Sequence, residues 1–143
     1  MDWKQPEGLR RHWLLEELDG ELLFQQMPIG AAQGRMGDDV YELRDNGLLR
    51  KRRTLAADGA VLATLEERAA GGGGTLRLGD AEYIWKPVNL MGTRWALRDA
   101  EGQTLFAYTV KPGLVNGVHV ELGTAPPETL GIPMLLCWYA MVL

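Results

Sequence analysis

The chain has 143 residues, of which 46% are hydrophobic and 24% charged, and its formal net charge is −4 at pH 7. This length and composition predict one globular domain and exclude an intrinsically disordered chain. The absence of a basic excess gives no reason to expect nucleic acid as a partner.

The chain contains one cysteine, Cys137, and no serine. A single cysteine cannot form an internal disulfide, and residues 1–6 lack the apolar stretch of a signal peptide, so we expect a cytoplasmic protein. Without serine, a Ser-His-Asp hydrolase is excluded. Only His12 and His119 accompany Cys137, which nearly excludes a zinc site of these residue types. We expect no metal, no cofactor and no enzymatic activity.

The predicted elements begin with an N-terminal arm over residues 1–11, in which Trp3 is expected to pack over one end of the domain or onto a partner. Glycine-centred turn signals then recur, such as Asp19-Gly20 and Asn46-Gly47. Such pairs supply the positive φ angles of tight hairpins. The segments between them alternate with period two, which predicts about ten to twelve short antiparallel strands.

Three of the predicted hairpins resemble copies of one unit. Residues 13–24 align without a gap on 95–106, with tryptophan, leucine, an acidic residue, glycine, leucine and phenylalanine in common. Residues 53–63 fit the same pattern with a turn one residue shorter. Repeated hairpins can bury their edges by closing into a barrel, and three copies are too few for a propeller, so we expect a barrel.

One basic cluster stands out in this acidic chain, and its members are Arg44, Arg50, Lys51, Arg52 and Arg53. We interpret it as a ligand-binding cluster for an anionic lipid head group or membrane surface. On an extended strand, alternate residues point to opposite faces, so Arg50 and Arg52 are expected to separate from Lys51 and Arg53 unless a bulge intervenes. The competing interpretation is an edge strand kept soluble by charge.

The glycine run over residues 71–74 invites a phosphate-loop interpretation, which we reject because no Walker lysine follows and the next residues have a strand pattern. The run is better explained as a hairpin connection. Carboxylates cluster at 16–21 and 66–67, but acidic residues beside turns usually face water. Asp38 and Asp39 lack the spaced ligands of a calcium loop.

The last predicted element is a helix over about 129–143, which carries no charge from Leu130 onward. A helix that is apolar all round is buried in a core or lies in lipid. Pro133 is tolerated only in the first turn. Fourteen residues span about 21 Å, short of the roughly 30 Å hydrocarbon core, so we expect a buried helix that fills a barrel and no transmembrane span.

These hairpins and the apolar helix resemble the tubby C-terminal-like superfamily, which includes the tubby proteins, phospholipid scramblases and LURP-one-related proteins. The stretch from Tyr83-Ile84-Trp85-Lys86-Pro87 to Trp95-Ala96-Leu97-Arg98-Asp99-Ala100-Glu101-Gly102 carries the likeness most clearly, and the pattern covers residues 12–143. The resemblance implies an antiparallel barrel around a central hydrophobic helix. It transfers no binding residues, because a shared fold does not carry function.

We therefore expect residues 12–143 to form a single tubby-like domain that acts as a non-enzymatic binding or scaffold module. Its expected ligand is an anionic lipid head group, such as a phosphoinositide, or a protein partner bound to the barrel exterior. One alternative is a protein that inserts its apolar C-terminal tail into a membrane or a partner. The other is a ligand-binding barrel or enzyme, disfavoured because the sequence offers no nucleophile–base set. The oligomeric state stays open.

Overall fold

The computed structural model describes residues 1–6, 11–46, 51–68, 72–110 and 117–143. Short strands account for most of these residues, and their bounds are β1 Asp2–Trp3, β2 His12–Leu15, β3 Gly20–Phe24, β4 Ala32–Met36, β5 Asp39–Asp45, β6 Lys51–Ala57, β7 Ala60–Glu67, β8 Gly74–Leu78, β9 Ala81–Pro87, β10 Arg94–Arg98, β11 Thr104–Thr109 and β12 Val118–Leu122. The helical elements are the 3₁₀ helices η1 (Glu16–Leu18) and η2 (Pro127–Thr129) and the α-helix α1 (Gly131–Val142).

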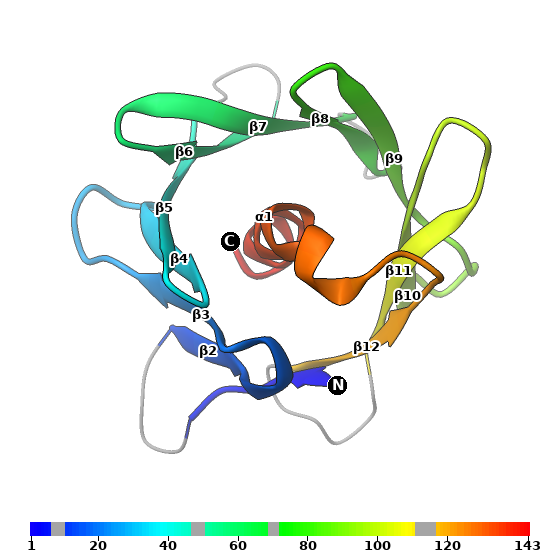
Figure 1. Cartoon of the computed structure of the whole chain (residues 1–143), viewed down its shortest axis with the longest axis horizontal. Helices are drawn as coiled ribbons and strands as arrows, with labels where there is room; N and C mark the ends of the chain where they lie inside the picture. Colours follow the sequence, from blue (N-terminus) through cyan, green and yellow to red (C-terminus); the bar gives the residue numbers. More distant parts are fainter. Residues whose placement is uncertain (7–10, 47–50, 69–71, 111–116) are drawn as a thin grey trace.

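The twelve strands found in the described residues form one antiparallel sheet. Strands β2 to β12 pair in chain order, and β1 pairs with β12 beyond them. Just after β1, Lys4 exchanges two backbone hydrogen bonds with Leu14 of β2, at N···O distances of 2.9 and 2.7 Å. These bonds bring the two edges of the sheet together, so that it curls into a nearly closed barrel (Figure 1).

Helix α1 runs through the lumen of this barrel (Figure 1). Its residues from Met134 to Tyr139 are at most 3% exposed. On β4, a Cβ at Gly34 would lie 3.1 Å from the Leu135 methyl groups, so glycine lets the wall approach the helix closely. The predicted fold class, a mainly β antiparallel barrel around a buried hydrophobic C-terminal helix, is confirmed. The helix bounds differ from the predicted 129–143 by two residues at the start and one at the end.

The first residues differ from the N-terminal arm predicted over 1–11, because Asp2–Trp3 forms a strand of the barrel. Trp3 is fully buried and stacks on Trp138 of α1, with a ring-centroid distance of 6.2 Å. Its indole Nε1 donates a hydrogen bond to Tyr108 Oη, which in turn donates to the carbonyl of Met134. Burial of this large side chain explains why the chain is part of the barrel from its start.

The glycine run has a steric role at the start of β8. Gly73 has a φ of +87°, and a Cβ there would lie 2.0 Å from the carbonyl oxygen of Trp85. A Cβ at Gly74 would lie 2.1 Å from the carbonyl oxygen of Glu66. The close approach of neighbouring strands therefore requires both glycines. This steric role agrees with the rejection of a phosphate-loop interpretation.

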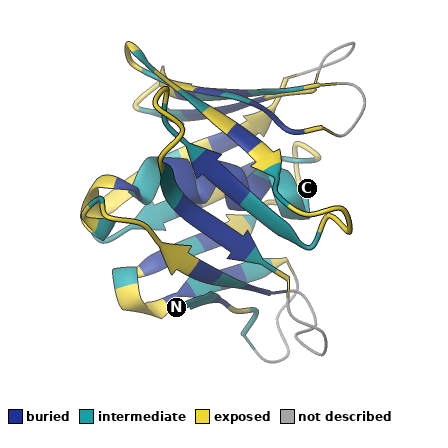
Figure 2. Ribbon diagram, turned by 90° about the vertical axis from the view of Figure 1, so that its right-hand side faces the viewer, coloured by how far each residue is buried: buried dark blue, intermediate teal, exposed yellow. Residues whose placement is uncertain are grey.

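The connections between strands divide between the two ends of the barrel, because neighbouring strands are antiparallel. Those that leave β2, β4, β6, β8, β10 and β12 lie around the start of α1, at what we call the turn end; they are residues 16–19, 37–38, 58–59, 79–80, 99–103 and 123–130. Strands β1, β3, β5, β7, β9 and β11 finish at the opposite end, the loop end, where α1 also finishes. Figure 2 shows the barrel from the side.

Candidate functional site

The predicted basic cluster of residues 44 and 50–53 is divided by the barrel wall. Lys51 and Arg52 are exposed at the start of β6, and Arg44 is exposed on the neighbouring β5. Arg53 is only 7% exposed, on the same side of the strand as the fully buried Leu55. Arg50 lies outside the described residues. The structure thus leaves Arg44, Lys51 and Arg52 available to a partner and turns Arg53 inward.

Arg53 lies between two carboxylates where α1 finishes. Its Nη1 is 3.2 Å from Glu67 Oε1, and its Nε is 3.7 Å from Asp45 Oδ1. Burial raises the pKa of the adjacent Tyr139 to about 12, the Asp45 carboxylate acts in the same direction, and Arg53 opposes both. Two flanking carboxylates disfavour an anionic ligand at Arg53. We therefore interpret this residue as an ionic contact of the inner wall.

A signal for the inward position of Arg53 is present in the hairpin repeat. In the aligned copies, Arg53 takes the position of Trp13 and Trp95. Trp13 is buried and packs edge-on against Trp138 of the helix, and Trp95 packs against the buried Trp85 at a centroid distance of 5.5 Å. The repeat therefore predicts an inward side chain at residue 53, although residue type alone suggests an exposed one.

The loop end exposes large hydrophobic side chains that the sequence analysis did not single out. Between β3 and β4, Met27 is 74% exposed and Ile29 is 90% exposed. Between β9 and β10, Leu90 is fully exposed and Met91 is 84% exposed. Among the described large hydrophobic residues, the next most exposed is Val61, at 57%. The sequence does contain a signal for the exposure of these four loop-end side chains, because they are apolar residues within segments that also carry turn formers.

Exposed cations accompany these side chains at the loop end. Lys51 and Arg52 begin β6, Arg68 directly follows β7, and Lys86 lies near the end of β9. Arg11 donates a hydrogen bond to the carbonyl of Val142 at the end of α1, and its guanidinium lies over the Phe24 ring. The loop end therefore combines protruding apolar side chains with positive charge.

The turn end has the opposite charge. All of its connections carry at least one carboxylate and none carries a lysine or arginine; the acidic residues are Glu16, Glu17, Asp19, Asp38, Asp58, Asp80, Asp99, Glu101 and Glu128. The modest net charge of the chain thus conceals a separation of charge along the barrel axis. Fields of this kind steer partners of complementary charge.

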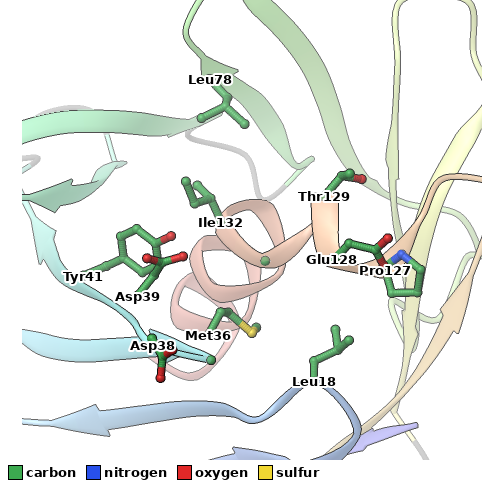
Figure 3. A pocket seen from close by; sticks show the side chains of 12 residues that line it. Leu18, Met36, Asp38, Asp39, Tyr41, Leu78, Pro127, Glu128, Thr129 and Ile132 are labelled. Atoms are coloured by element: carbon green, nitrogen blue, oxygen red, sulfur yellow. The ribbon is translucent and has the colours of Figure 1, made fainter.

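A pocket of about 520 Å³ opens at the turn end, above the first turn of α1 (Figure 3). Its apolar lining comes from η1, β4, β5, β8 and α1; these side chains are Leu18, Met36, Tyr41, Leu78 and Ile132. Asp38, Asp39 and Glu128 contribute carboxylates to the same pocket. The pKa of Tyr41 is raised by burial and by the nearby Asp39 carboxylate. This volume lies within the range of small-ligand pockets.

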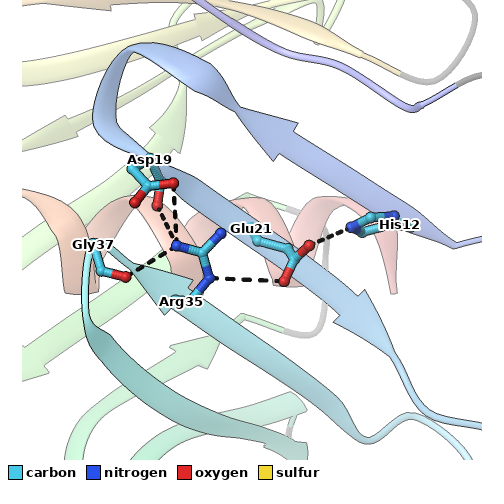
Figure 4. Close-up of polar contacts among 5 residues, drawn as sticks. All are labelled: His12, Asp19, Glu21, Arg35 and Gly37. Atoms are coloured by element: carbon cyan, nitrogen blue, oxygen red, sulfur yellow. Dashed lines mark hydrogen bonds and ion pairs between the residues drawn. The ribbon is translucent and has the colours of Figure 1, made fainter.

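Part of the acidic cluster over residues 16–21 belongs to a ladder of polar contacts across β2, β3 and β4 (Figure 4). His12 Nε2 lies 2.7 Å from Glu21 Oε2, and Arg35 Nε lies 3.8 Å from Glu21 Oε1. Arg35 Nη1 contacts the Asp19 carboxylate at 3.2 Å and donates hydrogen bonds to the carbonyls of Asp19 and Gly37. These contacts join three neighbouring strands directly, so we interpret them as structural.

The second histidine and the cysteine have structural surroundings as well. His119 Nδ1 lies 2.6 Å from Asp2 Oδ1, across the pairing of β12 with β1. The two histidines therefore contact different carboxylates. Cys137 is fully buried in α1, and burial, with a further contribution from Glu67, raises the pKa of its thiol well above the usual value. A thiol in these surroundings is unreactive.

Comparisons of the chain with protein-family models, with curated proteins and with solved structures found no match. The resemblance to the tubby C-terminal-like superfamily thus stays an expectation from the sequence. Within the described residues, no helix is both long enough and apolar enough to cross a membrane.

Proposed function

We propose that this protein is a non-enzymatic binding module that docks its loop end on anionic lipid surfaces. The observation that carries the proposal is that Met27, Ile29, Leu90 and Met91 project from the same end of the barrel as Lys51 and Arg52. Apolar side chains enter the boundary between head groups and acyl chains, and cations attract the anionic surface. Stable membrane association usually requires two such signals together.

The resemblance to the tubby-like proteins supports this proposal, since that superfamily includes phosphoinositide-binding and membrane-acting members. We propose tubby-like membership on the hairpin pattern and the central helix, and a cytoplasmic location on the single cysteine. The cytoplasmic leaflet carries the anionic lipids that would attract the cations of the loop end. Phosphoinositides are the most highly charged head groups of this class.

The other functions that the sequence leaves open have less support. Insertion of the apolar C-terminal tail requires α1 to leave the lumen and expose side chains that are fully buried, including Leu135, Leu136 and Tyr139. A ligand-binding barrel or enzyme of lipocalin type requires an open lumen, but α1 occupies it (Figure 1). A protein partner at the loop end is an outcome of the experiment below.

The experiment is cosedimentation with phosphatidylcholine vesicles, with and without phosphatidylserine or phosphoinositide. We expect binding only to the anionic vesicles and a loss of binding at high salt. The double variant K51Q/R52Q should bind about thirtyfold more weakly, since each cation contributes about 1 kcal/mol near an anionic surface.

The matched control is R35Q/R77Q, which removes the same charge from positions near the turn end. It should bind anionic vesicles within about threefold of the parent protein, because those residues lie at the opposite end of the barrel. Equal losses in both double variants, or equal binding to neutral and anionic vesicles, would contradict the proposal. Failure to bind any vesicle would contradict docking on lipid, and a protein would then be the remaining candidate partner of the loop end.

A further inference from the structure

We infer that the turn-end pocket binds a lysine or arginine side chain presented by a basic segment of a partner protein. The pocket is separate from the loop end, and it has its own chemistry of apolar walls and a carboxylate rim (Figure 3). Together with the proposed lipid docking of the loop end, on which this role rests, the second site would make the protein an adaptor between a membrane and a basic partner.

The walls of the pocket fit the stem of a long cationic side chain. Leu18, Leu78 and Ile132 supply aliphatic surface from three different elements, and Met36 adds a flexible thioether. Lysine and arginine bury their methylene groups along such surfaces and keep the charged head group at the polar rim. A pocket of about 520 Å³ has room for one such side chain and an apolar neighbour.

The rim selects the charge of the occupant. Asp38, Asp39 and Glu128 all line the pocket, and no lysine, arginine or histidine lines it with them. Among the described residues, none of these three carboxylates forms an ion pair with a cation of the chain. An incoming ammonium or guanidinium group therefore meets acceptors that internal cations do not occupy.

Other occupants fit the site less well. The start of α1 attracts anions, but the three rim carboxylates repel them. Within the described residues, no group of three or more His, Cys, Asp or Glu side chains is arranged to hold a metal ion. The acidic surface also extends well beyond the pocket, to turns such as Asp58 and Asp80. A small amine cannot use those turns, whereas a segment with several cations can.

The test uses the full chain labelled at its isoleucine δ1 methyl groups. Its three isoleucines report on three places: Ile132 on the pocket, Ile29 on the loop end and Ile84 on the exposed wall. The probe is a fluorescein-labelled peptide of alternating lysine and leucine, with a glutamate–leucine peptide as its charge-reversed control. We expect the lysine peptide to shift the Ile132 signal, to leave Ile29 and Ile84 in place, and to bind more weakly at high salt.

Two triple variants separate the pocket from the general acidity of the turn end. D38N/D39N/E128Q neutralises the rim, and D58N/D80N/E101Q removes the same charge from turns that do not line the pocket. We expect the rim variant to bind the lysine peptide at least about tenfold more weakly and the turn variant to change by less than about threefold. Unchanged Ile84 and Ile29 signals confirm that each variant is folded.

The inference is overturned by equal losses in the two triple variants, which would show unspecific attraction, or by peptide-induced shifts at Ile29 in place of Ile132. It is also overturned if n-hexylammonium binds as tightly as the lysine peptide, because the site would then be a small-amine pocket. Binding of the glutamate peptide would also overturn the inference, because the pocket would then not select a cationic side chain. Each of these outcomes leaves the vesicle experiment untouched, since that experiment concerns the other end of the barrel.

Discussion

The two ends of the barrel are built from alternate connections of the same chain, yet they have opposite surfaces. The turn end has connections that carry carboxylates and no lysine or arginine. The loop end has protruding apolar side chains and exposed cations, among them Ile29, Leu90 and Arg52. In an up-and-down barrel every second connection lies at the same end. A sequence can therefore specialise the two ends independently.

The acidity of the turn end has in part a conformational origin. Asp19 and Asp58 have positive φ angles of 48° and 52°, and Gly59 and Gly102 follow acidic residues with φ of +80° and +82°. Aspartate tolerates the left-handed region better than most residues, and glycine enters it without strain. Tight turns therefore select aspartate for its backbone, and an acidic surface results.

The largest effect is expected in the lumen, which supports both ends. Leu136→Ala should lower the free energy of unfolding by about 3–5 kcal/mol, because this fully buried side chain of α1 leaves a cavity when it is truncated. Val142→Ala, near the end of the helix and only partly buried, is the control and should cost less than half as much. Urea unfolding measures both. A cost below 1 kcal/mol for Leu136→Ala would show that the helix is not packed as described.

A second prediction compares glycines at the two ends. Gly73→Ala at the loop end should cost about 2–4 kcal/mol, because a positive φ and a backbone clash act together. Gly59→Ala at the turn end should cost about 1–2 kcal/mol, because its surroundings are open and only the φ is unfavourable. Gly72→Ala, which also has open surroundings, is the control and should be within about 0.5 kcal/mol of the parent. Equal costs at residues 59 and 73 would contradict the described approach of β8 to its neighbours.

A third prediction concerns the hydroxyl of Tyr139, which donates a hydrogen bond to the carbonyl of Gly30 at the loop end. Tyr139→Phe should cost about 1–2 kcal/mol at neutral pH. Because the folded-state pKa is raised to about 12, above an unfolded value near 10, the protonated hydroxyl stabilises the folded state below about pH 10. That contribution is lost as the pH rises toward 12.

The measurement is the free energy of unfolding as a function of pH for the parent and for Tyr139→Phe. The parent should lose stability progressively above about pH 10, and the difference between the two proteins should shrink over the same range. Cys137, with its raised thiol pKa, adds a loss above about pH 9 that both proteins share. A constant difference across this range would contradict the described environment of Tyr139.

The smallest effect on stability is expected at the loop tips. The double variant I29S/M91S should unfold within about 0.5 kcal/mol of the parent, because both side chains are exposed. Its binding to anionic vesicles should nevertheless weaken by roughly tenfold, since it loses apolar surface that would enter the membrane. Val61→Ser, an exposed apolar residue near the turn end, should leave vesicle binding unchanged. Equal vesicle binding by I29S/M91S and the parent would remove the loop tips from the proposed surface.

Local signals in the sequence were sufficient to predict the fold. Period-two alternation, Asp-Gly and Asn-Gly turns, and an uncharged C-terminal run each act over a few residues, and together they predicted the strands, their antiparallel pairing and α1. The strand at Trp3 was not predicted, because its pairing with Val118 joins residues far apart in the chain. Such contacts depend on closure of the whole sheet.

The candidate sites were less accessible from the sequence than the fold. The basic cluster is visible in the sequence, and the expected alternation is observed at Arg52 and Arg53. The contact of Arg53 with Asp45 and Glu67, however, depends on three neighbouring strands. The turn-end pocket combines Leu18, Leu78 and Glu128, which no local pattern connects. The exposure of Ile29 likewise becomes visible only once its connection is placed at an end of the barrel.

The most direct test of the division between the ends is methyl NMR of the isoleucine-labelled protein with phosphatidylserine-containing vesicles that carry a small fraction of paramagnetic lipid. Docking through the loop end predicts that the Ile29 signal is attenuated first and most strongly, Ile84 less, and Ile132 least. Because relaxation by the paramagnetic lipid falls steeply with distance, this order reports the orientation directly. Attenuation of Ile132 equal to or greater than that of Ile29 would contradict the account.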